Sequence, residues 1–146
     1  MRPLDWPTVA DPFRLDGRTV IVTGASRGIG AEVARSIAAQ GGGVVAVARS
    51  ADDLAAVVDT LPGPRAAVVG DVADTEVVGE AVAAAEELGG LWGVVNNAGI
   101  NPFYHPVTET PLSEWDEVLR VNLLGAAAFS RAVGRYLIEA GTGGRI

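Results

Sequence analysis

The stretch TGASRGIG, from Thr23 to Gly30, decides the fold class of this 146-residue chain. An apolar run, Thr19 to Val22, precedes it, and Ile29, Val33 and Ile37 then recur every four residues. This pattern predicts a buried strand, a glycine-rich turn and an amphipathic helix. Glycines let the backbone turn tightly and approach a ligand, and the N–H groups at the start of a helix bind anions.

We expect this turn to bind a pyrophosphate group. The residues expected to contact the ligand are Gly24, Ala25, Ser26, Arg27, Gly28, Ile29 and Gly30. Their spacing is Gly-x-x-x-Gly-x-Gly and differs from the general dinucleotide fingerprint Gly-x-Gly-x-x-Gly, because Val33 stands where the last glycine would be. A glycine-rich turn without a ligand is therefore the alternative.

Downstream of the turn, apolar runs too short for helices alternate with longer stretches of helical period. We expect strands at residues 19–22, 44–48, 66–70 and 92–96, and helices at about 29–40, 50–60, 74–88 and 113–141. Ser50 and Asp53 resemble a capping box at the start of the second helix. The alternation is typical of an α/β fold with a Rossmann-like, doubly wound parallel sheet. Residues 1–14 are expected to form an irregular arm, and residues 15–146 the dinucleotide-binding domain.

The composition excludes several classes of function. Hydrophobic residues make up 49% and charged residues 20% of the chain, as in a globular protein, and the net charge of −7 disfavours nucleic-acid binding and attachment to an anionic membrane. One histidine and no cysteine leave no cluster with metal-ligand spacing. No segment approaches the ~20 apolar residues of a membrane span, and residues 1–16 lack the apolar region of a secretory signal. We therefore expect a cytoplasmic protein without a metal site.

Two arginines indicate which dinucleotide the turn binds. Arg27 and Arg49 each follow a predicted strand and stand beside the start of a helix, where the helix dipole disfavours a cation by about 0.3–1 kcal/mol. An anion between the ends of the first two strands would reverse that effect. The 2′-phosphate of NADP fits this position, and Ala48 occupies the place of the acidic residue that would bind the ribose of NAD. We expect NADP rather than NAD, and the alternative is two solvated surface arginines.

From about Phe13 to Ile146 the chain resembles the short-chain dehydrogenase/reductase family. The motifs that carry the resemblance are Thr23 to Gly30, Asp71-Val72, Asn96-Asn97-Ala98-Gly99 and Val121-Asn122-Leu123. The resemblance implies the strand order 3-2-1-4 and cofactor contacts from Asp71, whose carboxylate would meet the adenine amino group. It implies further contacts from Val72, Asn97, Ala98 and Gly99, and Arg27 and Arg49 match the basic positions of NADP-preferring members. Taken alone, Asp71 and the two asparagines could equally be turn residues.

Asn122 is the one catalytic residue that the resemblance implies in this chain, where it would hold a water of the family's proton relay. Its spacing from apolar residues places it on the buried stripe of the last predicted helix. These residues are Trp115, Val118, Leu119, Ala126, Phe129 and Val133. A buried amide without partners costs about 1–3 kcal/mol, so we expect a hydrogen-bond network or a water around it. An amide satisfied by nearby backbone is the alternative.

The chain lacks the other catalytic groups of the family. It has no lysine, so neither Tyr104 nor Tyr136 is followed by the lysine that the family places four residues later. A tyrosine of pKa ~10 is a poor base at neutral pH without a neighbouring cation. Gly143 to Ile146 resembles the lead into the fifth strand, so we expect a domain truncated before strand five and inactive alone. The complete protein is expected to be a homo-oligomer, and the fourth strand is expected to be unpaired in this chain.

The function expected for the complete protein is hydride transfer between NADP(H) and a small-molecule ketone or secondary alcohol. A non-catalytic NADP-binding module is one alternative. A serine hydrolase is another, because Gly24-Ala25-Ser26-Arg27-Gly28 matches the Gly-x-Ser-x-Gly elbow, and Asp71 and His105 follow in the hydrolase order. Against the hydrolase, no earlier strand and loop would build an oxyanion hole, and His105 is otherwise expected to be a structural or surface residue.

Overall fold

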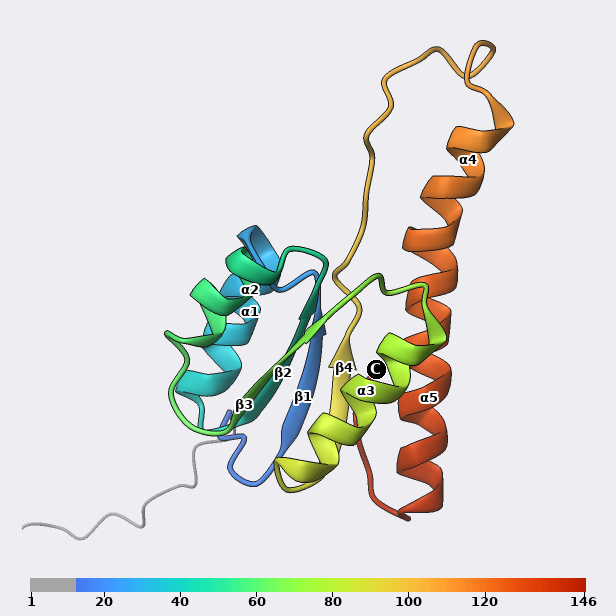
Figure 1. Cartoon of the computed structure of the whole chain (residues 1–146). Coiled ribbons are helices and arrows are strands. Elements are labelled where there is room, and N and C mark those ends of the chain that lie inside the picture. Colours follow the sequence, from blue (N-terminus) through green and yellow to red (C-terminus); the bar gives the residue numbers. More distant parts are fainter. Residues whose placement is uncertain (1–12) are drawn as a thin grey trace, which may run out of the picture.

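The computed structural model describes residues 13–146, and their arrangement is drawn in Figure 1. Four parallel strands form one sheet in the order β3-β2-β1-β4. They are β1 (Thr19–Thr23), β2 (Gly43–Ala48), β3 (Arg65–Val69) and β4 (Leu91–Val95). The predicted fold class and strand order are therefore confirmed. Of the predicted N-terminal arm, residues 1–12 lie outside the described residues.

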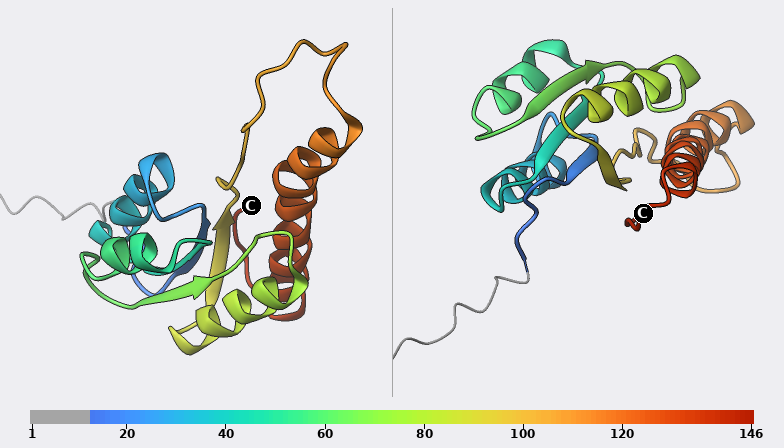
Figure 2. Two further views of the ribbon diagram at one scale, coloured as in Figure 1. Left: turned by 45° about the horizontal axis from the view of Figure 1, so that its top comes forward. Right: turned by 90° about the horizontal axis from the view of Figure 1, so that it is seen from below.

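Helices cover both faces of the sheet. Helices α1 (Gly28–Ala39) and α2 (Ala51–Val58) lie on one face, and α3 (Thr75–Glu87) and α5 (Ala126–Glu139) lie on the other (Figures 1 and 2). Val22 packs in the core beneath α1 and α2, whereas its neighbour Ile21 packs in the core beneath α3 and α5. Burial of both faces explains why β1 and β2, which are buried at every position, are nearly continuous apolar runs.

The beginning of α2 differs from the prediction in its hydrogen bonding. Ser50 stands at the N-cap of α2, as expected, but its side chain makes no capping bond to the backbone of the helix. Its Oγ instead donates to the Asp53 carboxylate at 2.8 Å. The predicted capping box is therefore wrong, because Ser50 uses its hydroxyl on the carboxylate rather than on an N–H group of the first turn.

The last predicted helix is three segments. Helix α4 (Leu112–Leu119) is followed by a π-helical segment, η1 (Arg120–Gly125), and then by α5. The buried residues of η1 and α5 follow one another at intervals of four: Val121, Gly125, Phe129, Val133 and Leu137. The wider turn of η1 moves Asn122 off this stripe, and α4 projects beyond the sheet in Figure 1. Trp115 and Leu119 are accordingly 43% and 45% exposed. The predicted stripe is therefore right at Phe129 and Val133, wrong at Trp115 and Leu119, and only half-buried at Val118 and Ala126.

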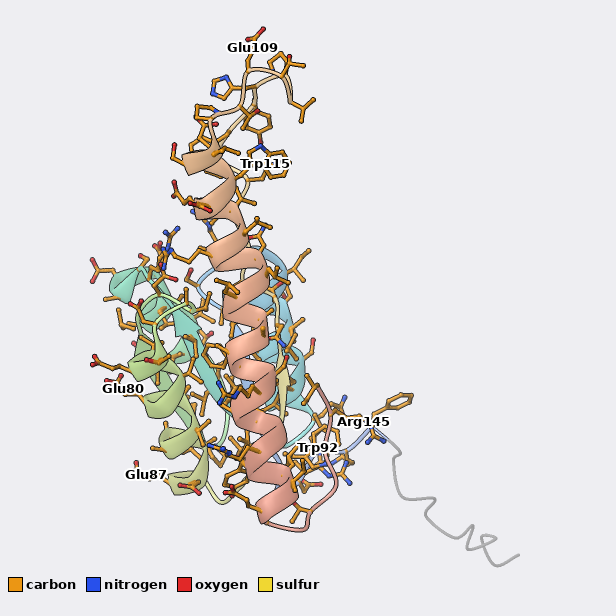
Figure 3. The ribbon with its side chains drawn as sticks, turned by 90° about the vertical axis from the view of Figure 1, so that its right-hand side faces the viewer. Glu80, Glu87, Trp92, Glu109, Trp115 and Arg145 are labelled. Atoms are coloured by element: carbon orange, nitrogen blue, oxygen red, sulfur yellow. The ribbon has the colours of Figure 1, made fainter. Side chains whose placement is uncertain are left out.

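The outer edge of β4 is partly covered. Arg145 forms a single parallel bridge to Gly93, donating its N–H to the Trp92 carbonyl and accepting from the Val94 N–H, both at 3.1 Å. The Arg145 guanidinium also stands 5.9 Å from the centre of the Trp92 ring, and both side chains are labelled in Figure 3. The expectation of an unpaired fourth strand is therefore wrong around Gly93, where one residue after α5 already pairs with it.

Candidate functional site

A groove of about 380 Å3 opens at the carboxyl ends of the strands. Ligands of doubly wound sheets bind at this edge, where the strand order reverses between β1 and β4. Of the residues predicted to bind a cofactor, the groove brings together Gly24, Ser26, Arg27, Ile29, Arg49, Asp71, Val72, Asn97, Ala98 and Gly99. It also includes residues that were not predicted, namely Ala48, Ser50, Asp53, Gly70, Ile100 and Val121.

The glycine-rich turn forms one wall of the groove through tight backbone packing. Gly24 and Gly28 have positive φ angles of 66° and 56°, which favour glycine. A Cβ on Gly30 would lie 2.5 Å from Nδ2 of Asn97 and closer still to the Gly24 carbonyl oxygen. Ala25 is fully buried and donates its N–H to the Val47 carbonyl at 3.2 Å. Ala25, Gly28 and Gly30 therefore shape the turn, and none of the three lines the groove.

Thr23 connects this turn to the end of β4, a role that sequence reasoning missed. Its hydroxyl donates to the Val95 carbonyl at 3.2 Å and accepts from the N–H groups of Asn97 and Ala98, both at 3.0 Å. The residue is 2% exposed. A hydroxyl at the end of an otherwise apolar strand was the available signal, because a buried hydroxyl requires partners.

The two asparagines after β4 bind in different directions. Asn97 donates from Nδ2 to the carbonyls of Thr23, at 2.9 Å, and Gly24, at 3.2 Å. Asn96 donates to the hydroxyl of Ser130 in α5 at 2.9 Å. Asn97 thus connects the segment after β4, which forms the floor of the groove, to the glycine-rich turn. Asn96 connects the same segment to α5.

Asp71 follows β3 and already has a partner for each carboxylate oxygen. Oδ1 accepts from the Ala73 N–H at 3.0 Å, and Oδ2 accepts from Nη2 of Arg120 at 2.7 Å. Partial burial acts to raise the pKa of the Asp71 carboxyl, but these two bonds and the charges of Arg120 and Arg49 outweigh it and hold the pKa below its usual range. Asp71 is therefore a carboxylate at neutral pH. Arg120 was not predicted, because it lies 49 residues away in the sequence.

Asn122 does not lie where the sequence pattern placed it. Its side chain is exposed, and it binds the backbone of Ile100 twice, accepting from the N–H at 2.8 Å and donating to the carbonyl at 2.9 Å. The expected buried amide is therefore wrong, and the alternative, an amide satisfied by nearby backbone, is observed. These two bonds hold the segment after β4 against η1. Ile100 lines the groove, whereas Asn122 does not.

Arg27 and Arg49 stand at the rim of the groove. Arg27 is the N-cap residue of α1, and Arg49 directly follows β2. Both residues are exposed, and within residues 13–146 neither forms an ion pair with a carboxylate. The first turn of α1 contains no acidic side chain. This rim therefore presents two cations and a helix N-terminus, an arrangement that attracts an anion.

The groups of the hydrolase alternative do not meet. Ser26 and Asp71 line the groove, but His105, the single histidine of the chain, lines a separate cavity of about 270 Å3 next to α4. Its Nε2 lies 3.5 Å from the Glu114 carboxylate.

Among residues 13–146, no group of histidine, aspartate and glutamate side chains is arranged to hold a metal ion, and no helix is both long and apolar enough to cross a membrane.

Comparisons with known proteins show which family the chain resembles. A family profile described as "short chain dehydrogenase" matches residues 18–146. The chain is 41% identical over 135 residues to D-threitol dehydrogenase of Mycolicibacterium smegmatis, a match that covers 90% of this chain and 52% of that protein. It is 39% identical over 141 residues to galactitol 2-dehydrogenase (L-tagatose-forming) of Cereibacter sphaeroides, covering 96% and 54%. The chain thus spans about half the length of these relatives.

Solved structures show the same likeness. A metagenomic short-chain oxidoreductase whose crystal structure is a complex with NADP superposes with a TM-score of 0.81 at 32% sequence identity. That match covers 90% of this chain and 61% of the solved one.

Proposed function

The chain belongs to the short-chain dehydrogenase family, and on that premise we propose that the complete protein transfers a hydride between NADP(H) and a ketone or secondary alcohol. In this proposal the present chain provides the cofactor-binding half. The observation that supports it most is the meeting of the α1 N-terminus, Arg27 and Arg49 at one groove along the carboxyl edge of the sheet. A pyrophosphate and a 2′-phosphate are the two anions of NADP.

The residues of the groove fit a dinucleotide. The N–H groups of the first turn of α1 would hold the pyrophosphate, and the Ser26 hydroxyl would donate to it. Gly24 and Gly30 let the turn pack against the end of β4, because a Cβ at either position would collide with the Asn97 side chain. The Asp71 carboxylate keeps further lone pairs for the adenine amino group beside its bonds to Ala73 and Arg120. When bound, NADPH would supply the hydride.

The preference for NADP over NAD rests on the charge at the end of β2. Arg49 follows the buried Ala48 there, where an acidic residue would bind the ribose hydroxyls of NAD. Asp53, a carboxylate of α2 that lines the groove, already accepts a hydrogen bond from Ser50. We propose that Arg49 and Arg27 bind the 2′-phosphate.

The chemistry beyond cofactor binding requires residues that this chain does not contain. A family enzyme uses a tyrosine whose pKa is lowered by a lysine, and the chain has no lysine. We therefore propose that the chain alone binds NADP without reducing ketones, with Asn122 as its one contribution to the proton relay. The relatives named for threitol and galactitol favour a polyol or its ketose as the substrate of the complete protein. A homo-oligomeric, cytoplasmic enzyme stays a prediction.

Fluorescence titration of the chain with NADPH and NADH tests the proposal. We expect NADPH to bind more tightly, and Arg49→Gln to raise the Kd for NADPH about tenfold while changing the Kd for NADH by less than about twofold. Arg65→Gln, at the start of β3 and away from the groove, is the matched control and should change neither Kd. Equal binding of the two cofactors by the wild-type chain would contradict the assignment of the arginines.

A non-catalytic NADP-binding module is the second candidate, because the groove is present and the lysine is absent. Consumption of NADPH with polyol-derived ketones by the complete protein separates the two functions. Turnover supports the oxidoreductase, and tight binding without turnover across such substrates supports the module.

A further inference from the structure

Arg120 connects η1 to the groove without lining it. It is the first residue of η1, and its Nη2 lies 2.7 Å from Oδ2 of Asp71. The Asp71 side chain is 18% exposed and that of Arg120 is 45% exposed. Asp71 lines the groove, whereas Arg120 does not. Any effect of Arg120 on a ligand in the groove therefore passes mainly through the Asp71 carboxylate.

The π-helical turn that carries Arg120 is held in place at its other residues. A Cβ on Gly125 would lie 2.7 Å from Cγ2 of Val72, the residue after Asp71, so this end of η1 packs directly on the strand-end segment. Asn122 binds the Ile100 backbone twice. Both contacts fix the backbone of η1. The Arg120 side chain therefore extends from a fixed backbone position and keeps the Asp71 carboxylate in one orientation.

The charges around the pair determine what Arg120 does. Asp71 is acted on by two cations, Arg120 from η1 and Arg49 from the end of β2. Arg120 in turn faces Asp71, Asp74 and Glu117. Without Arg120, the Asp71 carboxylate would attract Arg49 and repel any phosphate that Arg49 binds. With Arg120 paired to it, much of that charge is neutralised and Arg49 is left for an incoming anion.

We propose that Arg120 is a positioning residue that sets the preference for NADP over NAD, by neutralising and orienting Asp71 so that Arg49 stays available to a 2′-phosphate. This inference rests on the proposed function, since it requires a nicotinamide dinucleotide in the groove. It adds a specificity residue that does not itself line the groove, and it gives the π-helical turn a role in cofactor choice.

The test is a cycle of variants in which the Kd values for NADPH and NADH are measured by fluorescence titration. Arg120→Gln should raise the Kd for NADPH about fivefold, the upper range for a part-exposed ion pair, and change the Kd for NADH by less than about twofold. Arg120→Lys keeps the charge and should restore most of the preference. In an Asp71→Asn background, Arg120→Gln should leave the NADPH-to-NADH ratio unchanged, because the charge that Arg120 neutralises is gone.

Arg131→Gln removes the same charge from α5, beside the separate cavity between α3 and α5, and serves as the matched control. It should leave both Kd values unchanged. Equal losses of NADPH and NADH affinity in Arg120→Gln, with Arg120→Lys no better, would show a structural role and overturn the inference. A loss of preference that persists in the Asp71→Asn background would overturn it as well. Failure of the wild-type chain to bind either dinucleotide would instead overturn the proposed function, and this inference with it.

Discussion

Replacing Thr23 with valine removes a single hydroxyl from the junction of β1, the glycine-rich turn and β4, and keeps the shape of the side chain. The N–H groups of Asn97 and Ala98 lose their acceptor, and the Val95 carbonyl loses a donor. An unsatisfied buried group costs about 1–3 kcal/mol, and Asn97 and Ala98 are only partly buried, so the expected loss of unfolding free energy is about 2–4 kcal/mol. Affinity for NADPH should fall as well, because the same bonds hold the floor of the groove.

Urea unfolding of the wild-type chain, Thr23→Val and Thr60→Val measures this loss. Thr60 is the matched control, since it is an exposed residue just after α2 and its hydroxyl makes one bond, at 2.6 Å to the Val57 carbonyl. Its removal should cost no more than about 1 kcal/mol. If Thr23→Val proved as stable as Thr60→Val and bound NADPH normally, the hydroxyl would not join the turn to β4, and the reasoning about this junction would be refuted.

Three further changes have expected outcomes. Gly30→Ala should lower NADPH affinity at least about tenfold, because its Cβ would collide with the Gly24 carbonyl. The control Gly79→Ala in α3, where nothing lies within 4 Å of the added Cβ, should bind NADPH normally and gain up to about 1 kcal/mol of unfolding free energy. Normal NADPH binding by Gly30→Ala in titrations would contradict the geometry of the turn. Asn122→Ala should lose about 1 kcal/mol in urea unfolding through its two bonds to Ile100, and an unchanged midpoint would show that these bonds do not form in solution. Burial acts to raise the pKa of the Asp71 carboxyl, but the bonds from Ala73 and Arg120 outweigh it and lower the pKa, so the carboxylate contributes stability at a pH above its ordinary pKa of about 3.9. This stability is lost as the pH falls through the lowered pKa, and Asp71→Asn should therefore show a flatter acid unfolding profile than the wild-type chain. Parallel profiles of the two proteins would contradict the assigned pKa shift.

The sheet and the groove were predictable because each depends on a local pattern. Residues 44–48 are apolar at every position, as a central parallel strand must be when helices cover both of its faces. Once the strands are located, the carboxyl ends of parallel strands must meet at one edge, so Gly24, Arg49, Asp71 and Asn97 could be brought together without a structure. The family resemblance added the strand order.

Apart from the local capping box at Ser50, the wrong or missing predictions have a common physical origin in contacts between residues far apart in the chain. The π-helical turn has no local signal, yet the extra residue it accommodates rotates Asn122 to an exposed position beside Ile100. The bond from Arg120 to Asp71 and the bridge from Arg145 to Gly93 likewise join segments about 50 residues apart. Periodicity assumes an unbroken helix, and spacing rules report only neighbours, so neither could show these contacts.

Amide chemical shifts of the isotope-labelled chain during NADPH addition test the central claim most directly. The account predicts saturable shifts confined to the glycine-rich turn and the strand ends, including Gly24, Ser26, Arg49, Asp71 and Asn97, with smaller shifts at the same amides when NADH is added. Shifts centred on the cavity between α3 and α5, or no saturable shifts in the groove, would contradict the claim that this edge of the sheet binds NADP.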